Sequence, residues 1–219
     1  MLAGMGEQGF VSELFFPRSC AGCGRAGAVL CSVCRWELRT VPHLVKRPIV
    51  LPGPVWSLGP YGGAHRGVII AMKERGNQDV RSYVGAVILA AIEYLQASGE
   101  LPEVVALVPA PTRVKSARRR GGDPVETICQ YAARSSAGGV KIARCLRTAA
   151  GVSDQSELDA ARRQLNIRGA IELRARPPQG VPLVLVDDVI TTGATMVASM
   201  DTLTVGGGNV CAGVTIADA

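Results

Sequence analysis

The chain has 219 residues, 47% of them hydrophobic and 19% charged, a composition that excludes a disordered or collagen-like protein. The length suits one well-cored domain with a small additional module. There are 24 basic and 18 acidic residues, which give a net charge of +6, and only four of the basic residues are lysines. Such an excess suits a phosphate-bearing partner, and ordinary compositional bias is the alternative explanation.

Residues 1–17 contain two glutamates and no basic residue, so we interpret them as a short amphipathic helix and not as a secretory signal. The longest apolar run, residues 86–92, is far shorter than the roughly 20 residues that a membrane-spanning helix needs. We therefore expect a cytoplasmic protein without membrane contact. In that compartment cysteines stay reduced, and paired cysteines indicate a metal before a disulfide.

Four of the seven cysteines form two C-x-x-C pairs in the sequence CAGCGRAGAVLCSVC, residues 20–34. Each pair can present two thiolates from one tight turn, and two such turns complete a tetrahedral zinc site. Four protein ligands leave no open coordination position, so the zinc would be structural. A pair of redox dithiols and chance clustering are the alternatives. The predicted ligands are Cys20, Cys23, Cys31 and Cys34.

Residues 42–55 contain four prolines, which favours an extended linker. We therefore divide the chain into an N-terminal helix and zinc-ribbon module over residues 1–41, a proline-rich linker over 42–55, and an α/β domain over 56–219.

Helix-like and strand-like segments alternate beyond the linker. The patterns predict helices over residues 64–75, 79–98, 123–136 and 194–207, and strands over 103–111, 141–147, 181–188 and 209–217. Asp123 has the position of an N-cap, with Pro124 as the first helical residue. Strands that are apolar throughout and alternate with helices predict a parallel sheet covered on both faces. In such a sheet, ligands bind beyond the carboxyl ends of the strands.

The segment VLVDDVITTGAT, residues 184–195, ends an apolar strand in two acids and continues into a turn rich in threonine. The adjacent carboxylates of Asp187 and Asp188 suit a vicinal diol or a divalent cation. The following hydroxyl and backbone N–H groups lead into a helix N-terminus, which favours a phosphate. A diol beside a phosphate describes a ribose 5-phosphate. The predicted phosphate loop consists of Thr191, Thr192, Gly193, Ala194 and Thr195.

Two other interpretations of this segment exist. The magnesium-binding strand of a nucleotide hydrolase also ends in acids, but those enzymes need the loop G-x-x-x-x-G-K-[ST], and no lysine of this chain follows a glycine. A solvated strand end with a turn would explain the threonines without a ligand.

VLVDDVITTGAT resembles the signature with which type I phosphoribosyltransferases bind phosphoribosyl pyrophosphate (PRPP). The cysteine module and the segments AMKERG, LVPAPTRVKSARRRGGD and LDAARRQLNIRGAI resemble the ComF-like, competence-associated branch of that family. The resemblance implies the family's parallel sheet flanked by helices, with Asp187 and Asp188 as catalytic residues on the ribose hydroxyls. It also implies a 5-phosphate held by Thr191 to Thr195, and Mg²⁺ on the pyrophosphate and ribose oxygens.

A basic run follows the strand at residues 103–111, where this enzyme class has its pyrophosphate loop. Positive charge there would balance a pyrophosphate leaving group, and a solvated face or a nucleic-acid patch is the alternative. Residues 148–169 resemble the hood that closes on the reacting centre. The branch usually continues the basic run with Gly-Phe-Asn-Gln, whereas this chain has Gly-Gly-Asp-Pro at 121–124. The candidate pyrophosphate ligands are Arg113, Lys115, Arg118, Arg119 and Arg120.

The resemblance implies an enzyme that transfers or recognises the phosphoribosyl group of PRPP, with an acceptor that the sequence does not identify. The alternative is a non-catalytic accessory of DNA uptake or repair that binds single-stranded DNA, a helicase or another protein of the competence machinery. The zinc ribbon and the basic run support this alternative. An aromatic content of 4% opposes it, because few side chains could stack on bases. Both readings allow a homo-oligomer.

Overall fold

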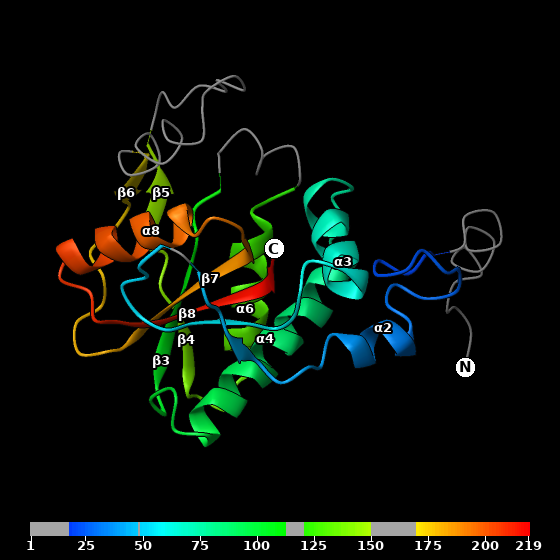
Figure 1. Ribbon diagram of the computed structural model, residues 1–219, viewed down its shortest axis with the longest axis horizontal. Helices are drawn as coiled ribbons and strands as arrows, with labels where there is room; N and C mark the ends of the chain where they lie inside the picture. The colour runs from blue at the N-terminus through cyan, green and yellow to red at the C-terminus, as the bar shows by residue number, and fades with distance from the viewer. Residues whose placement is uncertain (1–17, 48, 113–120, 150–169) are drawn as a thin grey trace, which may run out of the picture.

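The computed structural model describes residues 18–47, 49–112, 121–149 and 170–219 (Figure 1). These residues form an α/β fold around a six-stranded sheet with the order β1-β2-β8-β7-β3-β4. Its strands are β1 (His43–Leu44), β2 (Val55–Ser57), β3 (Val105–Pro109), β4 (Val140–Ile142), β7 (Leu183–Ile190) and β8 (Val210–Asp218). Every neighbouring pair in this sheet is parallel except β1 and β2. Helices cover both faces, so the predicted α/β class with a mostly parallel sheet flanked by helices is confirmed.

The central strands are β3 (Val105–Pro109), β7 (Leu183–Ile190) and β8 (Val210–Asp218). Val184 and Val186 of β7 belong to one apolar cluster with α3 (Gly63–Lys73), α4 (Asp79–Ala97) and α6 (Pro124–Ser135). Leu183 and Leu185 belong to a second cluster with α8 (Ala194–Val205). Successive side chains of a strand point to opposite faces, so a strand buried on both faces is apolar at every position.

The helices predicted over residues 64–75, 79–98, 123–136 and 194–207 correspond to α3, α4, α6 and α8. The single strand predicted over 141–147 is wrong, because the segment contains parts of two strands in different sheets. β4 (Val140–Ile142) pairs with β3 in the main sheet, whereas β5 (Leu146–Thr148) pairs with β6 (Ile171–Leu173) in a separate two-stranded sheet. The pairing partners, which lie elsewhere in the sequence, decide where each strand ends.

The described part of the cysteine module packs against α3. Its helix α2 (Ser32–Glu37) begins directly after Cys31, the first cysteine of the second C-x-x-C pair. Gly22 and Gly67 bring the first cysteine loop and α3 into backbone contact, since a Cβ on Gly67 would collide with the carbonyl group of Gly22. Cys20 and Cys34 belong to the same apolar cluster as α3, α4 and the sheet. The module therefore shares its core with the α/β fold.

Residues 42–55, expected to be an extended linker, contribute to the main sheet. β1 (His43–Leu44) pairs with β2 (Val55–Ser57), and β2 pairs in parallel with β8. The division of the chain into residues 1–41, 42–55 and 56–219 stays a prediction. The whole predicted N-terminal helix, nearly all of the hood-like segment and the whole basic run of 113–120 lie outside the described residues. Among the described helices, none is long and apolar enough to cross a membrane.

Candidate functional site

The carboxyl ends of the parallel strands β2, β3, β7 and β8 meet at one edge of the sheet, as Figure 1 shows for β7 and β8. β7 continues to Ile190, two residues beyond the end predicted from the sequence, because its pairing with β8 extends as far as Asp218. Asp187 and Asp188 therefore lie near the carboxyl end of β7, shortly before the loop that follows this strand. Ligands of open parallel sheets bind at such an edge.

The two acids differ in their surroundings. Asp188 is buried, with 3% of its surface exposed, and its Oδ1 accepts a hydrogen bond from the backbone N–H of Val189 at 2.7 Å. Asp187 is half-buried, and its Oδ1 accepts from the backbone N–H of Asp188 at 2.8 Å. Each carboxylate therefore has one oxygen fixed by the backbone immediately after it, which leaves the second oxygen for another partner.

Burial raises the pKa of Asp187 well above its ordinary value, and the negative charge of Asp188 raises it further. The backbone N–H of Asp188 and the charge of Lys73 act in the opposite direction and lower this pKa. Two neighbouring carboxylates with so little water are costly to keep charged. Donors from a ligand, such as hydroxyl groups, or a cation would relieve that cost.

Lys73, in the last turn of α3, is the charged partner of Asp188. Its Nζ lies 2.5 Å from Asp188 Oδ2, and its side chain is 35% exposed. The segment AMKERG, to which Lys73 belongs, is part of the family resemblance, but its sequence predicts no role for the lysine. The segment itself was the available signal, but only the packing of α3 against the sheet brings the ammonium to the acid.

The loop after β7 turns through a left-handed glycine into a helix. Gly193 has a φ of +84°, in the left-handed region that a residue with a Cβ rarely adopts, and is the N-cap of α8. Thr191 and Thr192 are exposed, and Thr192 Oγ1 accepts from the backbone N–H of Ala194 at 3.4 Å. α8 begins at Ala194 as predicted, so the loop leads directly into a helix N-terminus. The positive end of the helix dipole and N–H groups at this position favour an anion.

Residues of the expected linker cross the carboxyl edge beside this loop. Arg47 donates from Nη2 to the carbonyl oxygen of Ile190 at 3.2 Å, and it lies 3.7 Å from Asp218 Oδ2. His43 Nε2 lies 3.1 Å from Asp218 Oδ1. The side chain of Ile49 is near Gly193, since a Cβ there would approach Ile49 Cγ2 to 3.0 Å. No pattern in the sequence predicted these neighbours of the site.

Residues 121–124 include the N-cap of α6. Asp123 caps α6, accepting hydrogen bonds from the backbone N–H groups of Val125 at 2.9 Å and Glu126 at 3.2 Å. Burial raises the pKa of Asp123, and these hydrogen bonds act against that rise. The N-cap predicted from the sequence is confirmed. The candidate pyrophosphate ligands lie outside the described residues: Arg113, Lys115, Arg118, Arg119 and Arg120.

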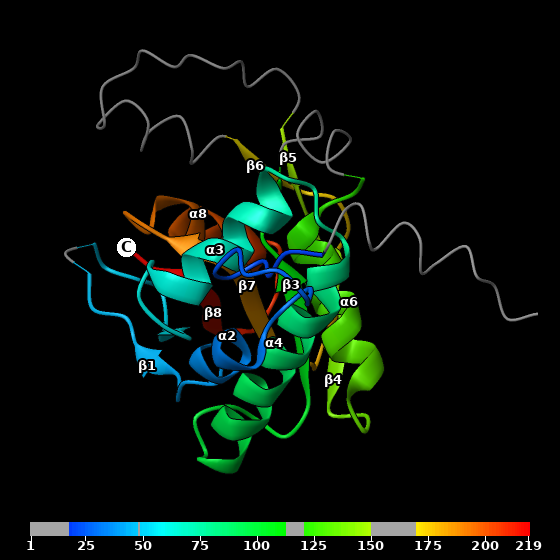
Figure 2. The same cartoon turned by 90° about the vertical axis from the view of Figure 1, so that its right-hand side faces the viewer.

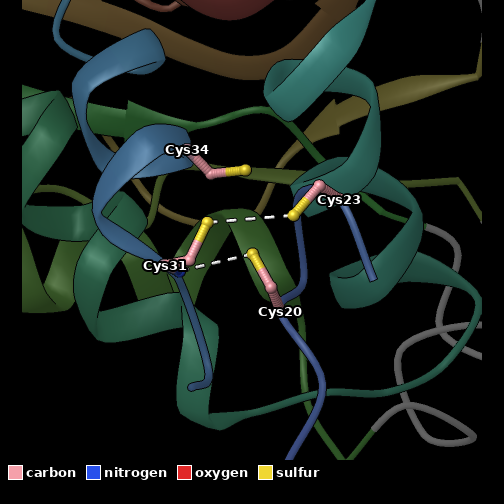
Figure 3. Close-up of side chains that lie close together, drawn as sticks. All are labelled: Cys20, Cys23, Cys31 and Cys34. Carbon is pink, nitrogen blue, oxygen red and sulfur yellow. Dashed lines mark hydrogen bonds between the residues drawn. The ribbon is translucent and has the colours of Figure 1, made fainter. Parts of the chain in front are cut away.

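The four predicted zinc ligands converge (Figure 3). Their Sγ atoms all lie within 4.8 Å of one another, and those of Cys23 and Cys31 are 3.8 Å apart. A tetrahedral zinc with Zn–S bonds of 2.3 Å requires sulfur atoms about 3.8 Å apart, so this cluster fits the ion. Thiolate sulfur is also the donor that structural zinc prefers.

The backbone prepares one of these thiols for metal binding. Burial opposes ionisation of Cys20, but hydrogen bonds from the backbone N–H groups of Cys31, Cys23 and Gly22 outweigh it and lower the pKa of Cys20 to about 6. The N–H of Cys31 lies 3.3 Å from Cys20 Sγ. Burial and hydrogen bonds with the other thiols raise the pKa of Cys34. Binding of zinc would therefore release protons from the remaining thiols.

No protein-family model matches the chain, and no curated protein matches it. Among solved structures, it is similar to a crystal structure of adenine phosphoribosyltransferase, with 14% sequence identity and a TM-score of 0.37. The similarity covers 85% of this chain and 89% of that one.

Proposed function

We propose that this chain is a PRPP-binding protein of the phosphoribosyltransferase type that transfers or recognises a phosphoribosyl group with Mg²⁺. One observation carries the proposal. The acidic pair of Asp187 and Asp188 is followed, five residues after Asp188, by the left-handed glycine Gly193, at which α8 opens. A diol-binding group and a phosphate-binding group therefore follow one another along a single strand and loop, at the edge where ligands of such sheets bind.

Each part has a chemical role in this proposal. Asp187 and Asp188 accept hydrogen bonds from the 2′- and 3′-hydroxyl groups of ribose, and the backbone of residues 191–195 donates to the 5-phosphate. Mg²⁺, when bound with PRPP, neutralises charge on the pyrophosphate. Departure of pyrophosphate from C1 gives an oxocarbenium-like transition state, which the protein stabilises by positioning and by negative charge nearby. The acceptor of the phosphoribosyl group remains to be identified.

Lys73 is a positioning residue in this proposal. Its ammonium balances the charge of Asp188 and holds Oδ2 in one place, so the carboxylate is oriented before a ligand arrives. A ribose hydroxyl that donates to the same oxygen then meets an acceptor whose orientation is already fixed.

Isothermal titration with PRPP and with ribose 5-phosphate, each with and without Mg²⁺, tests the proposal. We expect both ligands to bind, and Mg²⁺ to strengthen the binding of PRPP. Replacement of Arg118, Arg119 and Arg120 by alanine should weaken the binding of PRPP more than the binding of ribose 5-phosphate. Only PRPP contains the pyrophosphate, and each charge-assisted contact with it contributes about 1.5–3 kcal/mol. Equal losses for both ligands would mean that the arginines act through general charge, and absence of PRPP binding would refute the proposal.

The rival class, an accessory that binds single-stranded DNA or a helicase, has support in the net charge of +6. Titration of the protein with oligo(dT) at several salt concentrations separates the two classes. Affinity for DNA that falls steeply with salt, together with no Mg²⁺-dependent binding of PRPP, would favour the accessory. The proposed zinc ion has the same structural role in either case.

A further inference from the structure

A groove with a volume of about 510 Å³ lies between α4 and the chain that leaves α2. Figure 2 shows α2 beside α4. The floor of the groove consists of buried apolar residues, among them Leu30, Leu38 and Leu58. None of the residues that line it belongs to the acidic pair, the phosphate loop or the cysteine cluster. The groove is therefore a separate feature of the surface.

One wall of the groove is an apolar stripe along α4. Tyr83, Ala86, Val87, Ala90 and Tyr94 line the groove and recur at the spacing that places residues on one face of a helix. Ala86 and Ala90 are exposed, and Tyr94 is 47% exposed. The stripe contains no charged residue and extends for about 17 Å along the helix axis. Small residues at its centre allow another helix to approach closely.

The opposite wall adds an exposed apolar residue and two arginines. Val41 is 61% exposed. Arg35 is held in place, because its Nε donates to the carbonyl oxygen of Leu30 at 2.9 Å and its guanidinium lies 4.6 Å from the ring centre of Tyr83. Arg39 also lines the groove, and no acidic residue in the described part of the chain does. The groove is thus apolar inside and positively charged at its edge.

We infer that this groove is a docking site for an amphipathic helix of a partner protein, with apolar side chains on one face and carboxylates beside them. The straight, apolar wall of α4 favours a helix, which binds grooves through side chains spaced three or four residues apart. The two arginines, with no acid among the lining residues, select acidic flanks by charge complementarity. This inference does not depend on the proposed binding of PRPP.

The test uses the full chain and a fluorescein-labelled peptide long enough for about four helical turns. The peptide carries leucines on one face and glutamates along both flanks, and its affinity is measured by fluorescence anisotropy. Ala90→Glu places a charge on the groove wall and should weaken binding about tenfold or more, because the bound peptide would bury that charge. Thr204→Glu is the control, since Thr204 is exposed on α8 and does not line the groove. It makes the same change in net charge and should leave the affinity within about twofold, as expected for a surface substitution away from the contact.

A second pair of measurements tests the charge preference. Arg39→Glu should weaken binding of the glutamate peptide and strengthen binding of a peptide in which lysines replace the glutamates. Circular dichroism confirms that each variant is folded. Absence of saturable binding, or equal effects of Ala90→Glu and Thr204→Glu, would overturn the inference. A parent dimer that Ala90→Glu dissociates would assign the groove to a second copy, and binding that occurs only after removal of residues 1–17 would assign it to the chain's own N-terminal segment.

Discussion

Substitution of the two neighbouring acids should change stability in opposite directions. We expect Asp187→Asn to stabilise the fold at neutral pH and Asp188→Asn to destabilise it, although each removes Mg²⁺-dependent binding of PRPP. The reason lies in their surroundings. Asp187 is half-buried beside a second carboxylate, whereas Asp188 has the ammonium of Lys73 at 2.5 Å. The asparagine at position 187 can still accept the hydrogen bond from the N–H of Asp188.

The sign for Asp187 follows from its raised pKa. Because the folded protein holds this proton more tightly than the unfolded chain, the contribution of Asp187 to stability is fully present below the ordinary pKa of 3.8 and is lost as pH rises through the raised pKa. Between these two values the loss is at most about 1.4 kcal/mol per pH unit for one proton. Asparagine does not titrate, so the advantage of Asp187→Asn should grow with pH across this window and then become constant.

The cost of Asp188→Asn comes from its pair with Lys73. A hydrogen bond to a charged group contributes about 1.5–3 kcal/mol. The lower end applies here, because Lys73 is 35% exposed and its ammonium can regain water when the carboxylate is removed.

Urea denaturation of the parent and both single variants, measured from about pH 4 to pH 8, gives these free energies of unfolding. Titration calorimetry with PRPP and Mg²⁺ gives the binding. If Asp187→Asn destabilises the protein at neutral pH, or loses stability with pH as the parent does, the assigned environment of Asp187 is wrong. If either folded variant binds PRPP as tightly as the parent, the acidic pair is a solvated strand end without a role in binding.

Three further predictions concern other parts of the fold. Lys73→Met should lower the free energy of unfolding, and a double-mutant cycle with Asp188→Asn should give a coupling of about 1–3 kcal/mol; a coupling near zero would show that the ion pair does not form in solution. Elemental analysis should find one zinc per chain, lost in Cys31→Ser, and chelation should lower the midpoint of a single unfolding transition, because Cys20 and Cys34 share the core of α3 and α4. Two separate transitions would show instead that the module unfolds alone. Asp123→Ala should cost about 0.5–2 kcal/mol as the cap of α6 is lost, whereas Asp123→Asn, which can still cap, should cost much less; equal thermal and urea stability of Asp123→Ala and the parent would contradict the cap.

The sequence by itself determined the features that depend on neighbouring residues. Apolar runs alternating with helical patterns predicted the α/β class, and Asp123 followed by proline predicted the start of α6. Gly193 before a helical pattern predicted the turn that opens α8. The spacing of the cysteines predicted a cluster able to hold zinc. Caps, turns and C-x-x-C pairs act over a few residues, so the local sequence contains the information that specifies them.

Tertiary structure alone decided which distant residues meet. The sequence pattern of residues 141–147 predicts one strand, yet the segment is divided between two sheets. β4 pairs with β3 in the main sheet, and β5 pairs with β6 in the small one. The prolines of 42–55 predicted a linker, but β8 pairs with β2 and so brings Arg47 to the end of β7. Lys73 reaches Asp188 only because apolar residues of α3 pack against the sheet. Such contacts depend on which buried surfaces fit together across the whole fold, and no local pattern specifies that choice.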